Sequence, residues 1–191
     1  MSSIEINPAY TKSPAQVGAQ IKSAFFDNEA IPNIKLGQIL DASSYEKLSQ
    51  TVSRTTLKPH VSPLEYRYGI ASLKLPQLTK SLSKFLKPIF GIELKEESWK
   101  LVSLTWKEYS MILDSYKSRV GFDVIVDVSD DFPDNAGADI VYTTGGEETV
   151  EIPASSNTLI IVKIGDKTRS FLRYANHYAK DKKRNFLVQH I

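Results

Sequence analysis

The feature that most constrains the fold is a run of short apolar segments between Phe122 and Leu187, separated by residues that favour turns. Residues 122–129 alternate apolar and polar side chains and are rich in β-branched types, which is typical of a strand with one buried and one wet face. Asp, Pro, Asn and Gly follow at 130–137 and predict a turn. Several short strands at such regular spacing predict an antiparallel sandwich or barrel.

The later segments extend this pattern. A hairpin is expected over 138–152, because the glycines between its two apolar halves permit the positive φ of a tight turn. Segment 158–164 is almost continuously apolar, which indicates a strand covered on both faces. Strands at 169–176 and 185–190 close the series, joined by the lysine-rich turn 180–184.

The first half of the chain favours helices. Residues 1–12 show no clear pattern and are expected to be a loose leader. Ser13 and Pro14 predict the start of a helix over 13–26, and an alternating strand is expected over 31–40.

Further helix and strand signals follow. Asp41 is a suitable N-cap for a helix that contains Tyr45 and Leu48. Pro76 predicts the start of another amphipathic helix, which Pro88 and Gly91 should end. Three more strands are expected at 66–71, 99–106 and 108–113.

Length and composition favour one domain over residues 1–191. We expect a helix-rich support over 1–97 and a strand-rich core over 98–191, an α+β architecture with the N-terminal helices packed on one sheet. With 24 Lys and Arg against 22 Asp and Glu, the net charge of +2 is too small to indicate nucleic-acid binding. The chain has no cysteine and no signal-peptide or membrane-spanning pattern, so the expected location is cytoplasmic.

The order of these motifs resembles the prolyl-hydroxylase-like branch of the 2-oxoglutarate and iron(II)-dependent oxygenases. Residues 107–114 are similar to the strand that ends in the family's iron-binding His-x-Asp, and 127–132 are similar to the next strand and turn. Residues 136–142 resemble its Gly-Gly-x-Leu strand, and 152–162 resemble its Pro-x-x-Asn followed by an apolar strand. The resemblance implies a double-stranded β-helix, a cupin-like jelly roll of two facing sheets.

The resemblance also implies a site for Fe(II) and 2-oxoglutarate. Asp114 matches the carboxylate ligand of iron, and His177 would serve as an imidazole ligand if the register is shifted. Arg184 matches the basic residue that holds the distal carboxylate of 2-oxoglutarate, and Tyr109 could hydrogen-bond the same ligand. Ile112 and Leu113 occupy the positions where the first imidazole is expected, so the metal triad departs from the family pattern.

Three interpretations of function remain open from the sequence. The first is a dioxygenase that hydroxylates a protein side chain, with Asp114, His177 and Arg184 converging on one pocket. The second is a non-catalytic relative whose barrel binds a partner, its pocket filled by apolar residues such as Leu113 and Phe171. In the third, a basic surface binds nucleic acid or an acidic partner; its residues are Arg169, Arg173, Lys180, Lys182, Lys183 and Arg184, with Tyr174 and Tyr178 for stacking.

Each candidate residue also has a structural interpretation. Asp114 is a residue type that caps turns, and His177 is a residue type that closes strand ends. Arg184, within a lysine-rich turn, is typical of a solvated surface residue. His60 and His190 are weaker ligand candidates.

Overall fold

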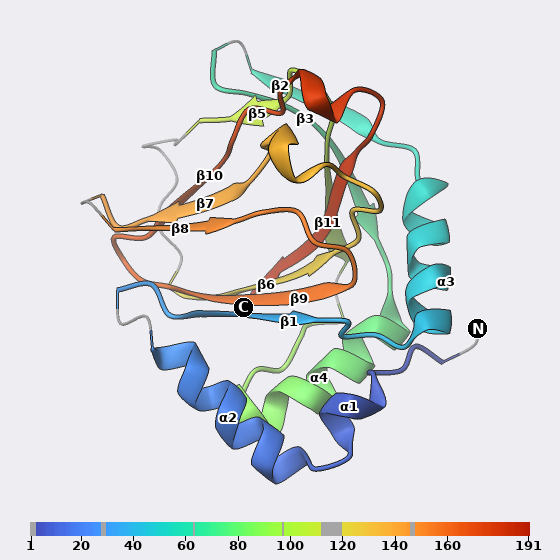
Figure 1. Cartoon of the computed structure of the whole chain (residues 1–191), viewed down its shortest axis with the longest axis vertical. Coiled ribbons are helices and arrows are strands. Elements are labelled where there is room, and N and C mark those ends of the chain that lie inside the picture. The colour runs from blue at the N-terminus through green and yellow to red at the C-terminus, as the bar shows by residue number, and fades with distance from the viewer. Residues whose placement is uncertain (1–2, 28–29, 63, 97, 112–119, 146–147) are drawn as a thin grey trace.

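The computed structural model describes residues 3–27, 30–62, 64–96, 98–111, 120–145 and 148–191. Figure 1 shows α1, α2 and α4 gathered at one end of a strongly curled sheet, with α3 along one side. The helices are α1 (Pro8–Thr11), α2 (Pro14–Phe26), α3 (Ala42–Ser53) and α4 (Pro76–Phe90), with two short 3-10 helices, η1 (Asp134–Ala136) and η2 (His177–Ala179).

Strand pairing within the described residues is antiparallel throughout. The strands are β1 (Asn33–Gly37), β2 (Lys58–Ser62), β3 (Tyr66–Leu73), β4 (Trp99–Leu104), β5 (Tyr109–Ser110), β6 (Gly121–Asp127), β7 (Ile140–Thr143), β8 (Thr149–Ile152), β9 (Thr158–Ile164), β10 (Arg169–Leu172) and β11 (Arg184–His190). Their order is β1-β9-β6-β11-β4-β3-β5-β10-β7-β8, with β2 paired to β3.

The sheet folds over on itself to enclose an inner apolar core. Tyr142 and Ile152, from β7 and β8, pack with Ile125, Ile160 and Phe186, from β6, β9 and β11. Because these two groups of strands are far apart in the pairing order, only a curled sheet brings them together. This two-layered antiparallel jelly roll confirms the predicted fold.

A second core lies between the helices and the outer face of the sheet. Phe25, Leu48 and Leu82 come from α2, α3 and α4, and they pack with Val126 and Ile161. The prediction of N-terminal helices packed on one sheet is therefore confirmed. Strand β9 contributes to both cores, as its continuous apolar run predicted.

Local sequence accounts for the helix ends. The carboxylate of Asp41 accepts a hydrogen bond from the Ser44 N–H at 3.0 Å and so caps α3. Helix α4 begins with Pro76 and ends at Gly91, whose φ of +71° suits glycine. The expectation that Pro88 ends this helix is wrong: Pro88 lies inside α4, and the Gly91 N–H closes the last turn on the Lys87 carbonyl at 3.0 Å.

Several segments differ from the sequence prediction. Residues 3–7 are not a loose leader, because Ile6 forms a β-bridge with Leu40 and α1 follows directly. Strand β2 was not predicted, since it contains Pro59; the strand lies at an edge, where a missing N–H is tolerated.

The strand expected over 169–176 ends at Leu172. The side chain of Asn176 accepts a hydrogen bond from the Tyr178 N–H and caps η2, so the chain leaves the sheet. Gly137 permits the close approach of this segment, because a Cβ there would lie 2.6 Å from the Tyr174 carbonyl oxygen.

Across the described ranges, each helix is too short or too polar to span a membrane.

Candidate functional site

The inner face of the jelly roll holds a buried ion pair. Arg184 is the first residue of β11 and Asp127 is the last residue of β6, and both side chains are 0% exposed. The Arg184 Nη2 donates to Asp127 Oδ2 at 3.1 Å. The carboxylate also accepts hydrogen bonds from the N–H groups of Ser129, at 3.0 Å, and Ser155, at 3.3 Å. Asp127 is therefore held by three donors.

Arg184 also links the two layers. Its Nη1 donates to the carbonyl oxygens of Ala138 and Ile152, the latter at 3.0 Å, and these residues lie next to β7 and at the end of β8. The ring of Phe186 lies 5.6 Å from the guanidinium carbon. Both terminal nitrogens of the guanidinium thus donate hydrogen bonds within the protein, and only its Nε lacks a hydrogen-bond partner among the described residues.

Burial controls the ionisation of this pair. It raises the pKa of the Asp127 carboxyl, while the Arg184 charge and the hydrogen bonds from Ser129 and Ser155 oppose the rise. Burial also lowers the pKa of Arg184, and Asp127 opposes that change. Because each group favours the charged form of the other, we treat the two as an ion pair at neutral pH.

A second polar group spans the inner face nearer the end of β11. The hydroxyl of Tyr142, on β7, donates to Asp123 Oδ2 at 2.8 Å, and His190 Nδ1 lies 2.8 Å from Asp123 Oδ1. Asp123 and His190 are direct cross-strand partners of β6 and β11. Burial raises the pKa of Tyr142 well above its ordinary value, and the negative charge of Asp123 raises it further. This group also connects the two layers.

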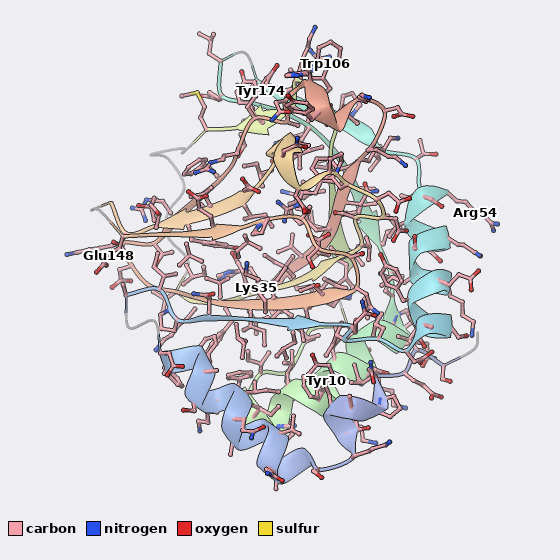
Figure 2. All side chains as sticks on the ribbon, viewed as in Figure 1. Tyr10, Lys35, Arg54, Trp106, Glu148 and Tyr174 are labelled. Carbon is pink, nitrogen blue, oxygen red and sulfur yellow. The ribbon has the colours of Figure 1, made fainter. Side chains whose placement is uncertain are left out.

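Lys35 adds positive charge to the same face. It pairs in register with Ile160, which belongs to the inner core, and its side chain is exposed at this edge of the sheet (Figure 2). Burial lowers the pKa of Lys35, and the positive charge of Arg184 lowers it further. The inner face therefore carries several polar and charged groups in addition to its apolar core.

The residues proposed as iron ligands are not brought together by the described part of the chain. Asp114, together with Ile112 and Leu113, lies outside the described residues. His177 is exposed and opens η2, where the centre of its ring lies 4.2 Å from that of Tyr178, with the two rings tilted by 35°. Arg184, in contrast, is fully buried.

The remaining candidates have structural contacts of their own. Tyr109 is half-buried on β5, with its ring 6.5 Å from that of Tyr174. His60 stacks on Tyr66 at 4.4 Å. Phe171, expected as a pocket filler in the non-catalytic interpretation, is half-buried on β10.

The basic surface is divided by the fold. Arg184 points inward and does not belong to it. Arg173 forms ion pairs with Asp139 and Glu151, and Lys182 lies 3.7 Å from Asp131.

The described residues alone do not form an iron(II) site. Such a site needs two imidazoles and a carboxylate on one face, and no group of three His, Cys, Asp or Glu side chains gathers within the described residues. At Arg184, the guanidinium already donates to the carboxylate of Asp127.

Sequence reasoning missed Asp127, Asp123 and Tyr142. The alternation over 122–129 did place Asp123 and Asp127 on one face, and that face was expected to be wet. In a curled sheet whose outer face is covered by helices, the polar face is instead the inner one. The sequence signal that could have identified this site was the pair of acidic residues on one face of strand 122–129, which is followed by the strands of the second layer.

Comparisons with solved structures identify this fold. A prolyl hydroxylase from Trichoplax adhaerens, in complex with a hypoxia inducible factor oxygen degradation domain peptide fragment, matches with a TM-score of 0.69 and 10% identity, over 95% of this chain and 91% of that chain. A Pseudomonas putida prolyl-4-hydroxylase matches with a TM-score of 0.66 and 8% identity, over 90% of this chain and 100% of that chain. An oxidoreductase of the 2OG-Fe(II) oxygenase family from Burkholderia pseudomallei matches with a TM-score of 0.62 and 14% identity, over 90% of this chain and 88% of that chain.

These likenesses show the oxygenase-like jelly-roll fold. No protein-family model matches the chain, and no curated protein matches its sequence.

Proposed function

We propose that this chain is a non-catalytic relative of the 2-oxoglutarate oxygenases, in which the jelly roll is the scaffold of a protein-binding module. The observation that carries the proposal is the Arg184–Asp127 pair. The resemblance assigns Arg184 to the carboxylate of 2-oxoglutarate, and in this chain the carboxylate on Arg184 is an internal one.

The energetics of a buried pair support this proposal. A 2-oxoglutarate carboxylate would have to displace Asp127 from Arg184 and leave a fully buried carboxylate without its cation. Breaking a buried pair in this way costs about 3–5 kcal/mol. That cost would oppose the entry of 2-oxoglutarate at physiological concentrations.

The second candidate function is a 2-oxoglutarate-dependent hydroxylase that acts on a protein side chain. The Trichoplax adhaerens neighbour favours it, because that enzyme is in complex with a peptide fragment. It requires Asp114, His177 and Arg184 to converge, with Fe(II) supplying the oxidising chemistry. The burial of Arg184 and the exposure of His177 weigh against that convergence.

Titration of iron(II) into chelator-treated protein, under nitrogen and with 2-oxoglutarate present, tests the choice. We expect no saturable heat of binding and no conversion of 2-oxoglutarate to succinate after oxygen is admitted. The Pseudomonas putida prolyl-4-hydroxylase is the positive control for the reagents. Saturable iron binding that disappears in Asp114→Ala would contradict the proposal and support the hydroxylase.

A further inference from the structure

A groove of about 920 Å³ lies outside the jelly roll, between α2, α4 and residues 3–11. Figure 1 shows α1, α2 and α4 together at one end of the molecule. Its volume is within the range of about 300–1,000 Å³ that is typical of ligand-binding clefts in proteins. None of the residues discussed above as candidate site residues lines this groove.

The walls of the groove are mainly apolar. Tyr10 lies where α1 meets α4 (Figure 2); its ring packs edge-on against Phe85 at 6.0 Å, and its hydroxyl donates to the Gly37 carbonyl at 2.7 Å. The apolar and small residues of the lining are Ile4, Ile6, Tyr10, Ala15, Gly18, Ala19, Phe85, Pro88 and Ile89.

Positive charges stand on both sides of the groove. Lys22 lies on α2, and Lys80 and Lys84 lie one turn apart on α4; all three are exposed. Within the described ranges no carboxylate pairs with any of them. Glu5, the acidic residue of the lining, is hydrogen-bonded to the Ser3 hydroxyl at 3.0 Å. An occupant would therefore need apolar groups and negative charge together.

The backbone of Ile6 offers an unused pair of hydrogen-bonding groups. Asn7 donates to the Ile39 carbonyl and Asp41 donates to the Glu5 carbonyl, which makes Ile6 and Leu40 a non-hydrogen-bonded antiparallel pair. In such a pair the N–H and C=O groups point away from the partner strand. On the Leu40 side, the Asn157 side chain satisfies both groups at 2.9 Å.

On the Ile6 side these groups face the groove. The carbonyl of Ile4, two residues earlier and therefore on the same edge, accepts a hydrogen bond from Ser81 of α4, which is a lining residue. For the N–H and C=O of Ile6 itself, no partner is found in the part of the chain that the structure describes. An extended peptide could make two backbone hydrogen bonds there.

We propose that this groove binds an extended segment of a partner protein that carries both apolar and acidic side chains. The apolar walls would contact the hydrophobic side chains of the segment. Its carboxylates would pair with Lys22, Lys80 and Lys84, and its backbone would hydrogen-bond to Ile6. An acyl chain would use the walls and the cations but leave the Ile6 groups without a partner. The inference rests on the proposed binding function and names the class of partner.

Selection from a random 12-residue peptide library on the full chain tests this proposal. The library is first depleted on Ala19→Trp, which places a bulky ring in the groove at an exposed helical position. Enriched peptides should combine Asp or Glu with Leu, Ile or Phe. Their affinity should fall at least tenfold in the triple variant Lys22→Glu/Lys80→Glu/Lys84→Glu.

The matched control reverses three exposed lysines away from the groove, Lys58, Lys74 and Lys183, so that both variants have the same net charge. Circular dichroism and thermal unfolding check that both triple variants are folded. Equal loss of affinity in the control would overturn the proposal, because it would show non-specific attraction. Enrichment of peptides without acidic residues, or no enrichment, would also overturn it.

The same measurements can also show that the groove binds a lipid or a second copy of the chain. Saturable binding of oleate that Ala19→Trp removes, without peptide binding, would overturn the proposal in favour of a lipid. Concentration-dependent dimerisation that the triple variant abolishes would overturn it in favour of a second copy of the chain. Iron binding by a chain that still selects acidic peptides would refute the non-catalytic proposal and leave this groove assignment standing.

Discussion

At the scale of single residues, the inner face of this jelly roll carries two polar groups within its apolar core. Arg184 and Asp127 are fully buried and bonded to each other. Asp123 joins Tyr142 on the facing layer to His190 on the neighbouring strand. The two layers are linked by the bonds from Arg184 to the carbonyls of Ala138 and Ile152 and by the bond from Tyr142 to Asp123.

Removing Asp127 should therefore destabilise the chain strongly. We expect Asp127→Ala to lower the free energy of unfolding by about 3–5 kcal/mol, because Arg184 would be left buried without a counter-charge. The matched control is Asp139→Ala, which breaks the exposed pair with Arg173 and should cost about 0–1 kcal/mol. Urea unfolding monitored by tryptophan fluorescence measures both. Equal values for the two variants would refute the role given to the pair.

The same residues show how far sequence reasoning reaches. Arg184 was identified as a candidate from its place in the motif order, but its lysine-rich neighbourhood favoured the surface. Lys182 and Lys183 are exposed, whereas β11 begins at Arg184 and turns that side chain inward. Burial of this kind depends on which strand lies opposite, and local composition does not carry that information.

At the scale of elements, helix α3 is attached to the N-terminal segment through its cap. Asp41 accepts from the Ser44 N–H at 3.0 Å and from the Ser44 hydroxyl at 2.7 Å, and that hydroxyl accepts from the Glu5 N–H at 2.8 Å. The cap thus helps to hold residues 3–6, which form one wall of the groove.

This cap should make part of the stability pH-dependent. The hydrogen bond from the Ser44 side chain lowers the pKa of Asp41 below its unfolded value, so its contribution is complete above the unfolded pKa of about 3.9 and is lost as pH falls through the lower folded value. We expect Asp41→Ala to cost about 0.5–2 kcal/mol at pH 7 and progressively less below about pH 4. Urea unfolding of both proteins between pH 7 and pH 3 tests this, and a difference that does not shrink at acid pH would contradict it.

Elements with strong local signals were predicted well. The N-cap at Asp41, the proline start of α4 and the apolar run of β9 all specify their structure within a few residues. Strand β2 and the early end of β10 were missed. Both depend on partners distant in the chain: β2 exists only through its pairing with β3, and β10 ends where the chain turns away from the sheet into η2.

At the scale of the whole molecule, the jelly roll has the fold of the prolyl hydroxylases, and on its inner face Arg184 is paired with Asp127. The neighbours share the fold at 8–14% identity, so the fold is retained while the residues within it differ widely. The sequence predicted the fold because the order of strands, turns and N-terminal helices survives such divergence. It could not predict the internal counter-ion of Arg184, because that contact joins residues 57 positions apart.

The central claim is that Asp127, and not a ligand, is the carboxylate on Arg184. Nitrogen-15 NMR of the arginine side chains, with the Arg184 signal identified by its absence in Arg184→Lys, measures this directly. We predict that the Arg184 signal shifts between wild type and Asp127→Asn and stays unchanged when 2-oxoglutarate is titrated into the wild-type chain. A saturable shift of that signal with 2-oxoglutarate would show that a ligand reaches the guanidinium and would contradict the account.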